Sequence, residues 1–180
     1  SREKFVDWYD DNKESGRAMV NGTQDQMPSR SNVVVNAGKS MPVVDFGPAY
    51  ASTDKTLACN LKMNSAQINN DTTEIYLIHA DTDSDGVTGL FGADRGTVPA
   101  EMGKYLWKRD GRKLLSSAST ALVNGTIRVD GQVADRTYEP AVGEFHLYTF
   151  IPTMGVCATD FAHTFYGGTE RHTGGARYGE

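Results

Sequence analysis

The chain has 180 residues, of which 38% are hydrophobic, and its 18 basic and 23 acidic residues give a formal charge of −5. This length and hydrophobic content suit one all-β domain spanning residues 1–180, while the negative charge opposes binding to nucleic acid. No run approaches the ~20 apolar residues that cross a bilayer, so no transmembrane segment is expected.

The first thirty residues contain one ambiguous window and one polar tract. Residues 3–9 carry Phe5, Trp8 and Tyr9 at a spacing that fits a short helix, but the same window also fits a strand. Both alternatives stay open. Residues 10–30 contain clusters of Asp, Asn, Glu and Gly, which indicate a long surface loop.

From residue 31 onward, short apolar runs alternate with Gly, Pro, Asn and Asp, a pattern typical of many-stranded β structure. Helical periodicity is nearly absent, so at most short helices are expected. The predicted strands span residues 31–35, 41–46, 57–63, 74–79, 87–91, 104–108, 113–116, 126–129, 132–136, 144–151 and 163–166.

Two dipeptides predict tight turns. Asn124-Gly125 and Asp130-Gly131 lie between β-forming residues and favour the left-handed backbone that hairpins need. Asp130-Gly131 is the stronger hairpin prediction, because it separates two predicted strands.

Two histidines lie on predicted strands. Strand 144–151 is apolar on both faces, which predicts a place within the sheet and a structural role for His146. His79 ends strand 74–79 beside an acidic turn, where it either caps the strand by a hydrogen bond or serves a metal or a proton transfer. The capping interpretation is favoured.

Three segments, in their order and spacing, resemble one family. They are Met-Pro-Val-Val-Asp-Phe-Gly at 41–47, Ile-Arg-Val-Asp-Gly at 127–131, and the closing residues 171–180 with Gly174, Gly175 and Glu180. The chain resembles bacterial laminin-G-like, concanavalin A-like lectin–glucanase jelly-roll domains. This resemblance implies an antiparallel two-sheet sandwich, an extracellular or cell-surface location, and other domains in the same polypeptide.

In that family the closing Gly-Gly segment runs on into an apolar strand. The resemblance therefore predicts an excised, processed or disordered end at Glu180. Within the segment, Gly174 and Gly175 permit unusual torsions or a close approach of two strands. Asp45, at the end of a predicted strand, is expected to bond the amides of the next turn. Arg177 is expected to bind a carboxylate, either of an acidic sugar or of a neighbouring Asp of the same fold, and the internal pairing is favoured.

The predicted ligand-binding residues are those whose side chains suit sugars. Tyr105 and Trp107 project from one face of a strand with Arg109 nearby, and form either a stacking platform for a glycan or part of the core. Arg171 and His172 flank the Gly-Gly turn and bind a carboxylate, either of an acidic sugar or of an Asp within the fold.

An acidic turn predicts a metal site. Asp81, Asp83 and Asp85, followed by Gly86, repeat the first ligand spacings of a calcium loop. Position twelve is Gly92 instead of Glu, so a helix–loop–helix site fails. Either these carboxylates bind Ca²⁺ together with another loop, or they form a solvated turn.

The two cysteines, Cys59 and Cys157, match no zinc or redox spacing and form either one disulfide or two buried thiols.

No catalytic motif is present: Glu-x-Asp-x-x-Glu, Gly-x-Ser-x-Gly and the phosphate-binding loop are all missing. We therefore expect a non-catalytic glycan-binding or adhesion module for a polysaccharide or a glycoprotein glycan. The alternatives are a structural or protein-interaction spacer, and a polysaccharide lyase or glycoside hydrolase with dispersed residues such as Arg128, His146 and Tyr148.

Overall fold

The structure is a computed structural model. It describes the backbone of residues 3–4, 7–9, 18–20, 29–35, 38–47, 49–52, 61–63, 72–82, 88–92, 107–109, 113–114, 120–156, 160–161, 163–166, 169–174 and 176–179. Side chains are described for residues 31–35, 38–47, 72–82, 91, 113–114, 120–156 and 177–179.

The described strands belong to three sheets. The largest contains β1 (Glu3–Lys4), β4 (Ser29–Val34), β5 (Ser40–Asp45), β8 (Ile75–Asp81), β11 (Thr126–Val129), β12 (Gln132–Val133), β13 (His146–Ile151) and β17 (Ala176–Gly179). The second contains β2 (Asp7–Tyr9), β3 (Ala18–Val20), β7 (Leu61–Met63), β9 (Thr88–Gly92), β10 (Trp107–Arg109) and β14 (Asp160–Phe161). The third contains β6 (Ala49–Ser52), β15 (His163–Tyr166) and β16 (Thr169–Gly174).

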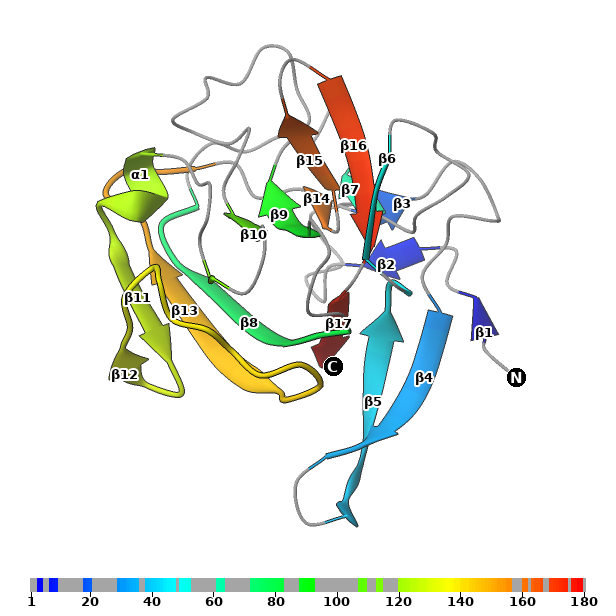
Figure 1. Cartoon of the computed structure of the whole chain (residues 1–180). Coiled ribbons are helices and arrows are strands. Elements are labelled where there is room, and N and C mark those ends of the chain that lie inside the picture. The colour runs from blue at the N-terminus through cyan, green and yellow to red at the C-terminus, as the bar shows by residue number, and fades with distance from the viewer. Residues whose placement is uncertain are drawn as a thin grey trace.

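The strand orders are β1-β4-β5-β17-β8-β13-β11-β12, β10-β9-β14-β7-β3-β2 and β15-β16-β6 (Figure 1). Every strand pair in the described part of the chain is antiparallel. Over the same residues the single helix is the four-residue α1 (Thr120–Val123). The predicted all-β class is confirmed.

Ten of the predicted strands overlap an observed strand, and of the eleventh, 113–116, only residues 113 and 114 are described. Residues 113 and 114 belong to no strand, because the Leu114 amide bonds the carbonyl of Tyr138 in a loop. Window 3–9 contains β1 and β2, so its strand alternative is correct. The predicted loop at 10–30 is wrong where β3 and the start of β4 lie.

The C-terminal segment differs most from its prediction. We expected a glycine-rich turn ahead of a missing strand, yet residues 169–174 and 176–179 are themselves the strands β16 and β17. β17 lies between β5 and β8, where Tyr178 pairs with both Val44 and His79 (Figure 1). Buried Tyr178 anchors this strand. Gly174, expected in the turn, is the last residue of β16, and Gly175 lies outside the described residues.

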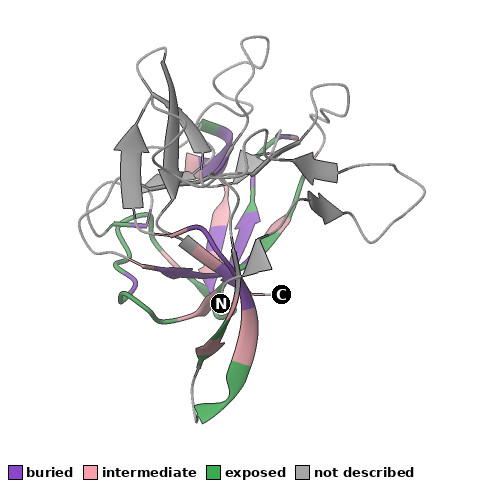
Figure 2. Ribbon diagram, turned by 90° about the vertical axis from the view of Figure 1, so that its right-hand side faces the viewer, coloured by how far each residue is buried: buried purple, intermediate pink, exposed green. Residues whose placement is uncertain are grey.

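The core forms on one side of the eight-stranded sheet, here called the inner face. Alternate residues of β8, β11 and β13 project into it, among them Leu77, Ile127 and Phe150. Phe91 of β9 contacts Phe150, with ring centroids 5.4 Å apart and planes at 65°. In the described part of the chain, buried residues concentrate in β5, β8, β11 and β13, whereas the far end of the β4–β5 hairpin is exposed (Figure 2).

Candidate functional site

The Asp130-Gly131 turn organises the candidate site. Asp130 and Gly131 have φ of 49° and 80°, and they join β11 to β12 with Val129 opposite Gln132. Positive φ at both central residues defines a type I′ turn, so the predicted hairpin is confirmed. Asn124-Gly125 instead links α1 to β11, since the amide of Asn124 bonds the helical carbonyl of Thr120.

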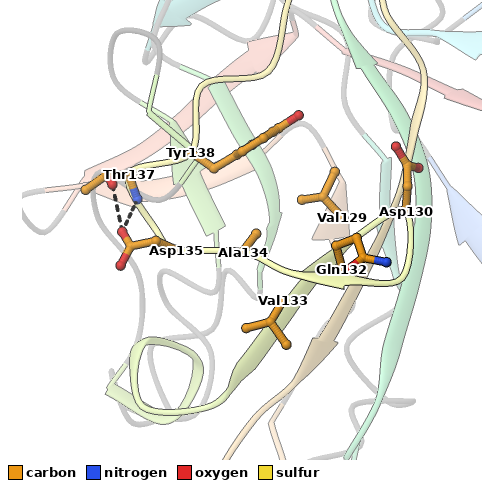
Figure 3. Close-up of a pocket in the computed structure, with 8 residues that line it drawn as sticks. All are labelled: Val129, Asp130, Gln132, Val133, Ala134, Asp135, Thr137 and Tyr138. Carbon is orange, nitrogen blue, oxygen red and sulfur yellow. Dashed lines mark hydrogen bonds between the residues drawn. The ribbon is translucent and has the colours of Figure 1, made fainter.

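A pocket of about 500 Å³ opens along this hairpin (Figure 3). Its volume lies in the range of small-molecule sites. Aliphatic side chains and an aromatic ring share the lining with two carboxylates, an amide and a hydroxyl. The lining residues are Val129, Asp130, Gln132, Val133, Ala134, Asp135, Thr137 and Tyr138.

Backbone hydrogen bonds hold the wall of this pocket against the core. The amide of Ala134 donates to the carbonyl of Ile127 at 2.9 Å, and the amide of Tyr138 donates to the backbone carbonyl of Asp135 at 3.0 Å. The carbonyl of Tyr138 accepts from Leu114, a fully buried residue, at 2.7 Å. The Tyr138 ring is therefore carried on a fixed backbone.

Asp135 is one of the two carboxylates that line the pocket. Its Oδ1 accepts hydrogen bonds from both the amide and the hydroxyl of Thr137, each at 2.7 Å (Figure 3). These bonds stabilise the carboxylate and lower the pKa of Asp135. Within the described part of the chain no such bond reaches Oδ2, which leaves that oxygen able to accept from a ligand hydroxyl.

Asp130 and His146 form a tight polar pair beside the pocket. Asp130 Oδ2 lies 2.7 Å from His146 Nδ1, and Asp130 Oδ1 accepts from the amide of Leu147 at 2.9 Å. The hydrogen bond with His146 makes the largest contribution to lowering the pKa of Asp130, and the bond from the Leu147 amide makes the next largest. Since an ionised carboxylate can only accept, the hydrogen of this bond belongs to Nδ1 of His146.

The other ring nitrogen of His146 faces the interior. Nε2 is buried and lies 3.7 Å from the Glu144 carboxylate, beyond hydrogen-bond distance. The ring meets Tyr138 edge-on at 6.4 Å and Tyr148 at 5.9 Å. His146 thus orients Asp130 and Tyr138, as its predicted structural role implies.

A row of aromatic and imidazole rings continues across the inner face. Tyr178, His79 and His146 are direct cross-strand partners on β17, β8 and β13. The ring of His79 lies 5.2 Å from that of Tyr178, and burial raises the pKa of the Tyr178 hydroxyl. His79 was predicted to end its strand, which is wrong, because β8 continues to Asp81 and His79 is buried.

The predicted roles of Asp45 and Arg177 are confirmed. Asp45 ends β5, and its Oδ1 accepts from the amide of Gly47 at 2.8 Å. Its Oδ2 accepts from Arg177 Nε at 3.0 Å, across the β5–β17 register. The guanidinium therefore pairs with a carboxylate inside the fold.

The predicted ligand-binding residues lie on other sheets. Trp107 and Arg109 belong to β10, and Arg171 and His172 belong to β16. Both β10 and β16 lie alongside β9, so the fold brings the backbones of these two pairs of predicted residues into one region (Figure 1). Their side chains and Tyr105 fall outside the described residues, and the assignment stays a prediction.

The calcium assignment also stays a prediction. Asp81 ends β8 with its carboxylate buried, Oδ1 lying 3.9 Å from His79 Nε2. Asp83 and Asp85 lie outside the described residues, as do Cys59 and Cys157. Over the residues that the structure describes, no group of three or more His, Cys, Asp or Glu is close enough to hold a metal.

The dispersed catalytic trio is not assembled. His146 and Tyr148 project to the inner face, whereas Arg128 pairs with Thr149 and projects to the opposite one. Successive side chains of a strand point to opposite faces of the sheet, so Arg128 of β11 lies on the other face from His146 and Tyr148.

Sequence reasoning missed Gln132, Asp135 and Tyr138 as site residues. The available signal was the Asp-x-Thr turn at 135–137 directly before a tyrosine.

Comparisons with protein-family models, with curated proteins and with solved structures find no match to this chain. Among the described residues, no helix has the length and apolar character to span a membrane.

Proposed function

We propose that this chain is a non-catalytic glycan-binding module that holds a sugar in the β11–β12 pocket. The observation that carries the proposal is the Tyr138 ring, which is 37% exposed and lines a pocket of about 500 Å³ together with polar groups. Sugars present apolar C–H faces to aromatic rings and hydroxyls to planar polar groups. The carboxylates of Asp130 and Asp135 and the amide of Gln132 supply the second requirement.

The lining favours a neutral glycan. Two carboxylates line the pocket, and its described lining contains no Lys or Arg. A uronic acid would meet like charge there, whereas hydroxyl groups donate to carboxylates readily. We expect hexose-based polysaccharides or glycoprotein glycans without acidic residues to bind.

A binding role, as opposed to catalysis, is supported by the burial of His146 Nε2. A general acid or base must reach the reacting atom within hydrogen-bond distance. Asp130, the neighbouring carboxylate, is engaged by His146 and by the amide of Leu147. In this proposal, His146 holds Asp130 in place, and Asp130 accepts hydrogen bonds from sugar hydroxyls without taking part in proton transfer.

The proposal includes a jelly-roll sandwich of the laminin-G-like type, located at a cell surface or outside the cell. The contact between Phe91 and Phe150 supports stacking of two sheets around a shared core. Calcium at Asp81, Asp83 and Asp85 remains part of the same proposal, as a support of the neighbouring loop.

The test is a glycan screen with the purified chain, with and without calcium. Tyr138→Ala should weaken retention of a bound glycan at least about tenfold, or about 1.4 kcal/mol, because it removes the stacking surface. The melting temperature should change little, since the ring is partly exposed. The matched control is Tyr76→Ala, which removes an exposed tyrosine outside the pocket and should leave binding intact.

Other outcomes separate the alternatives. Loss of binding in Trp107→Ala but not in Tyr138→Ala would place the site on β10. Release of shortened or unsaturated products would identify a hydrolase or lyase. Indifference to every glycan would favour a spacer module and contradict the proposal.

A further inference from the structure

The solvent side of β8, β13, β11 and β12, here called the outer face, is unusually apolar. It exposes Tyr76 (62%), Ile78 (38%), Val133 (71%), Leu147 (42%) and Ile151 (36%). The side of an antiparallel sheet that faces water normally carries polar residues. A contiguous apolar patch of this kind commonly marks an interaction surface.

The strand register makes these side chains neighbours. Ile78 lies directly opposite Leu147. In the next row, Tyr76 pairs with Thr149, Thr149 with Arg128, and Arg128 with Val133, so that this row crosses all four strands. Ile151 continues the β13 column beside Thr126. The exposed apolar side chains therefore surround Thr149 of β13, which is itself buried between Tyr76 and Arg128.

Opposite charges flank this surface. On the β8 side, the Tyr76 hydroxyl donates to the exposed Glu74 carboxylate at 2.7 Å. This bond and the charge of Glu74 raise the pKa of Tyr76, so its ring stays neutral. On the β11 side, Arg128 donates from Nη1 to the carbonyl of Gly131 at 3.2 Å. Acid and aromatic ring thus lie on one flank, and a cation on the other.

We propose that the outer face binds a second copy of this chain around a two-fold axis running along β13. Such a rotation exchanges the two flanks, so Tyr76 and Glu74 of one copy meet Arg128 of the other, twice. Leu147 and Ile151, near the axis, meet their own counterparts. A cation over an aromatic ring and beside a carboxylate is favourable, and the contact is isologous, as closed dimers require.

The size of the face predicts a weak dimer. Strands β8, β13, β11 and β12 contain seven, six, four and two residues, which at about 3.3 Å per residue and about 4.8 Å between strands cover roughly 300 Å². This is less than half of the ~800 Å² per partner that stable interfaces bury, so we expect a weak dimer with a dissociation constant of at least about 0.1 mM.

Sedimentation velocity of the full chain, at concentrations on both sides of that constant, tests the proposal. Leu147→Asp should weaken dimerisation at least about tenfold, because it buries charge at the axis. Glu74→Arg and Arg128→Glu should each weaken it by several fold, and the double variant should recover most of the loss. Val34→Asp introduces the same charge at an exposed valine on the β4–β5 hairpin, away from the outer face, and should change nothing.

Circular dichroism shows whether each variant is folded. Recovery of dimerisation in the double variant Glu74→Arg, Arg128→Glu excludes misfolding as the reason that the single variants dimerise weakly. A wild-type chain that stays monomeric at all concentrations overturns the proposal. So does a dimer that tolerates Leu147→Asp, or a charge-swapped double variant weaker than both singles. Val133 belongs to both the outer face and the pocket lining (Figure 3), so the two results are separated at Leu147, whose side chain lies on the outer face outside that lining. Leu147→Asp should therefore bind glycan normally.

Discussion

At the scale of single residues, Asp130 combines a backbone role with an electrostatic one. Its φ of 49° belongs to the left-handed region, which Asp and Asn adopt more readily than most residues. Its carboxylate joins the turn to β13 through Leu147 and His146. One side chain therefore fixes the hairpin, the imidazole and one side of the pocket.

Asp130→Asn tests the electrostatic role while keeping a residue that tolerates the same φ. Because the folded pKa of Asp130 lies below its unfolded value, its contribution is fully present above the ordinary carboxyl pKa. That contribution is lost as pH falls through the lowered value. At neutral pH we expect a loss of about 1 kcal/mol or less, since the carboxylate is largely exposed and screened.

Urea unfolding at several pH values, in a cycle with His146→Gln, measures this coupling. The gap between wild type and Asp130→Asn should shrink in acid. A gap that keeps its size from neutral to acidic pH would contradict the assignment.

At the scale of elements, β17 fits between β5 and β8 because Gly179 has no side chain. A Cβ atom there would lie 2.7 Å from Ile78 Cγ2 and 3.3 Å from Met41 Cε. The neighbours on both flanking strands occupy the space that a side chain would need.

Gly179→Ala should therefore lower the free energy of unfolding by about 1–3 kcal/mol through overpacking. Ile78→Ala removes the closest clashing atom, so the double variant should lose clearly less than the two single losses added together. Denaturant unfolding of the four proteins measures this coupling. Strict additivity would show that Ile78 does not confine Gly179.

At the scale of the whole molecule, stability depends on contact between sheets. Phe91 comes from the six-stranded sheet and Phe150 from the eight-stranded one, and both are buried. A sheet cannot bury its apolar face alone and needs a second layer against it. The contact between Phe91 and Phe150 supplies such a link between segments about sixty residues apart in sequence.

Phe91→Ala should cost about 3–5 kcal/mol, a large part of the stability of a typical domain. Thermal unfolding followed by circular dichroism measures it, with the exposed Val34→Ala as the control that should stay within about 0.5 kcal/mol of wild type. A loss below about 1 kcal/mol for Phe91→Ala would mean that the sheets do not depend on this contact.

The sequence by itself determined local features. Alternating β-forming residues and turn formers located most strands, Asp130-Gly131 located its hairpin, and Asp45 was identified as a strand-end residue that bonds the next turn. These follow from interactions over a few residues, which a single sequence contains. β17 was missed because its four residues, Ala176–Gly179, follow two glycines that favour a turn and show no strand pattern of their own, and only pairing with β5 and β8 makes it a strand.

Tertiary structure alone decided which distant residues meet. It brought Asp130 to His146 and Tyr138, paired Arg177 with Asp45, sent Arg128 to the face opposite Tyr148, and left the outer face apolar. Strand order and register set these contacts, and both depend on pairing between segments far apart in the chain. No local pattern in the sequence encodes that pairing, because its free energy comes from burying two faces together.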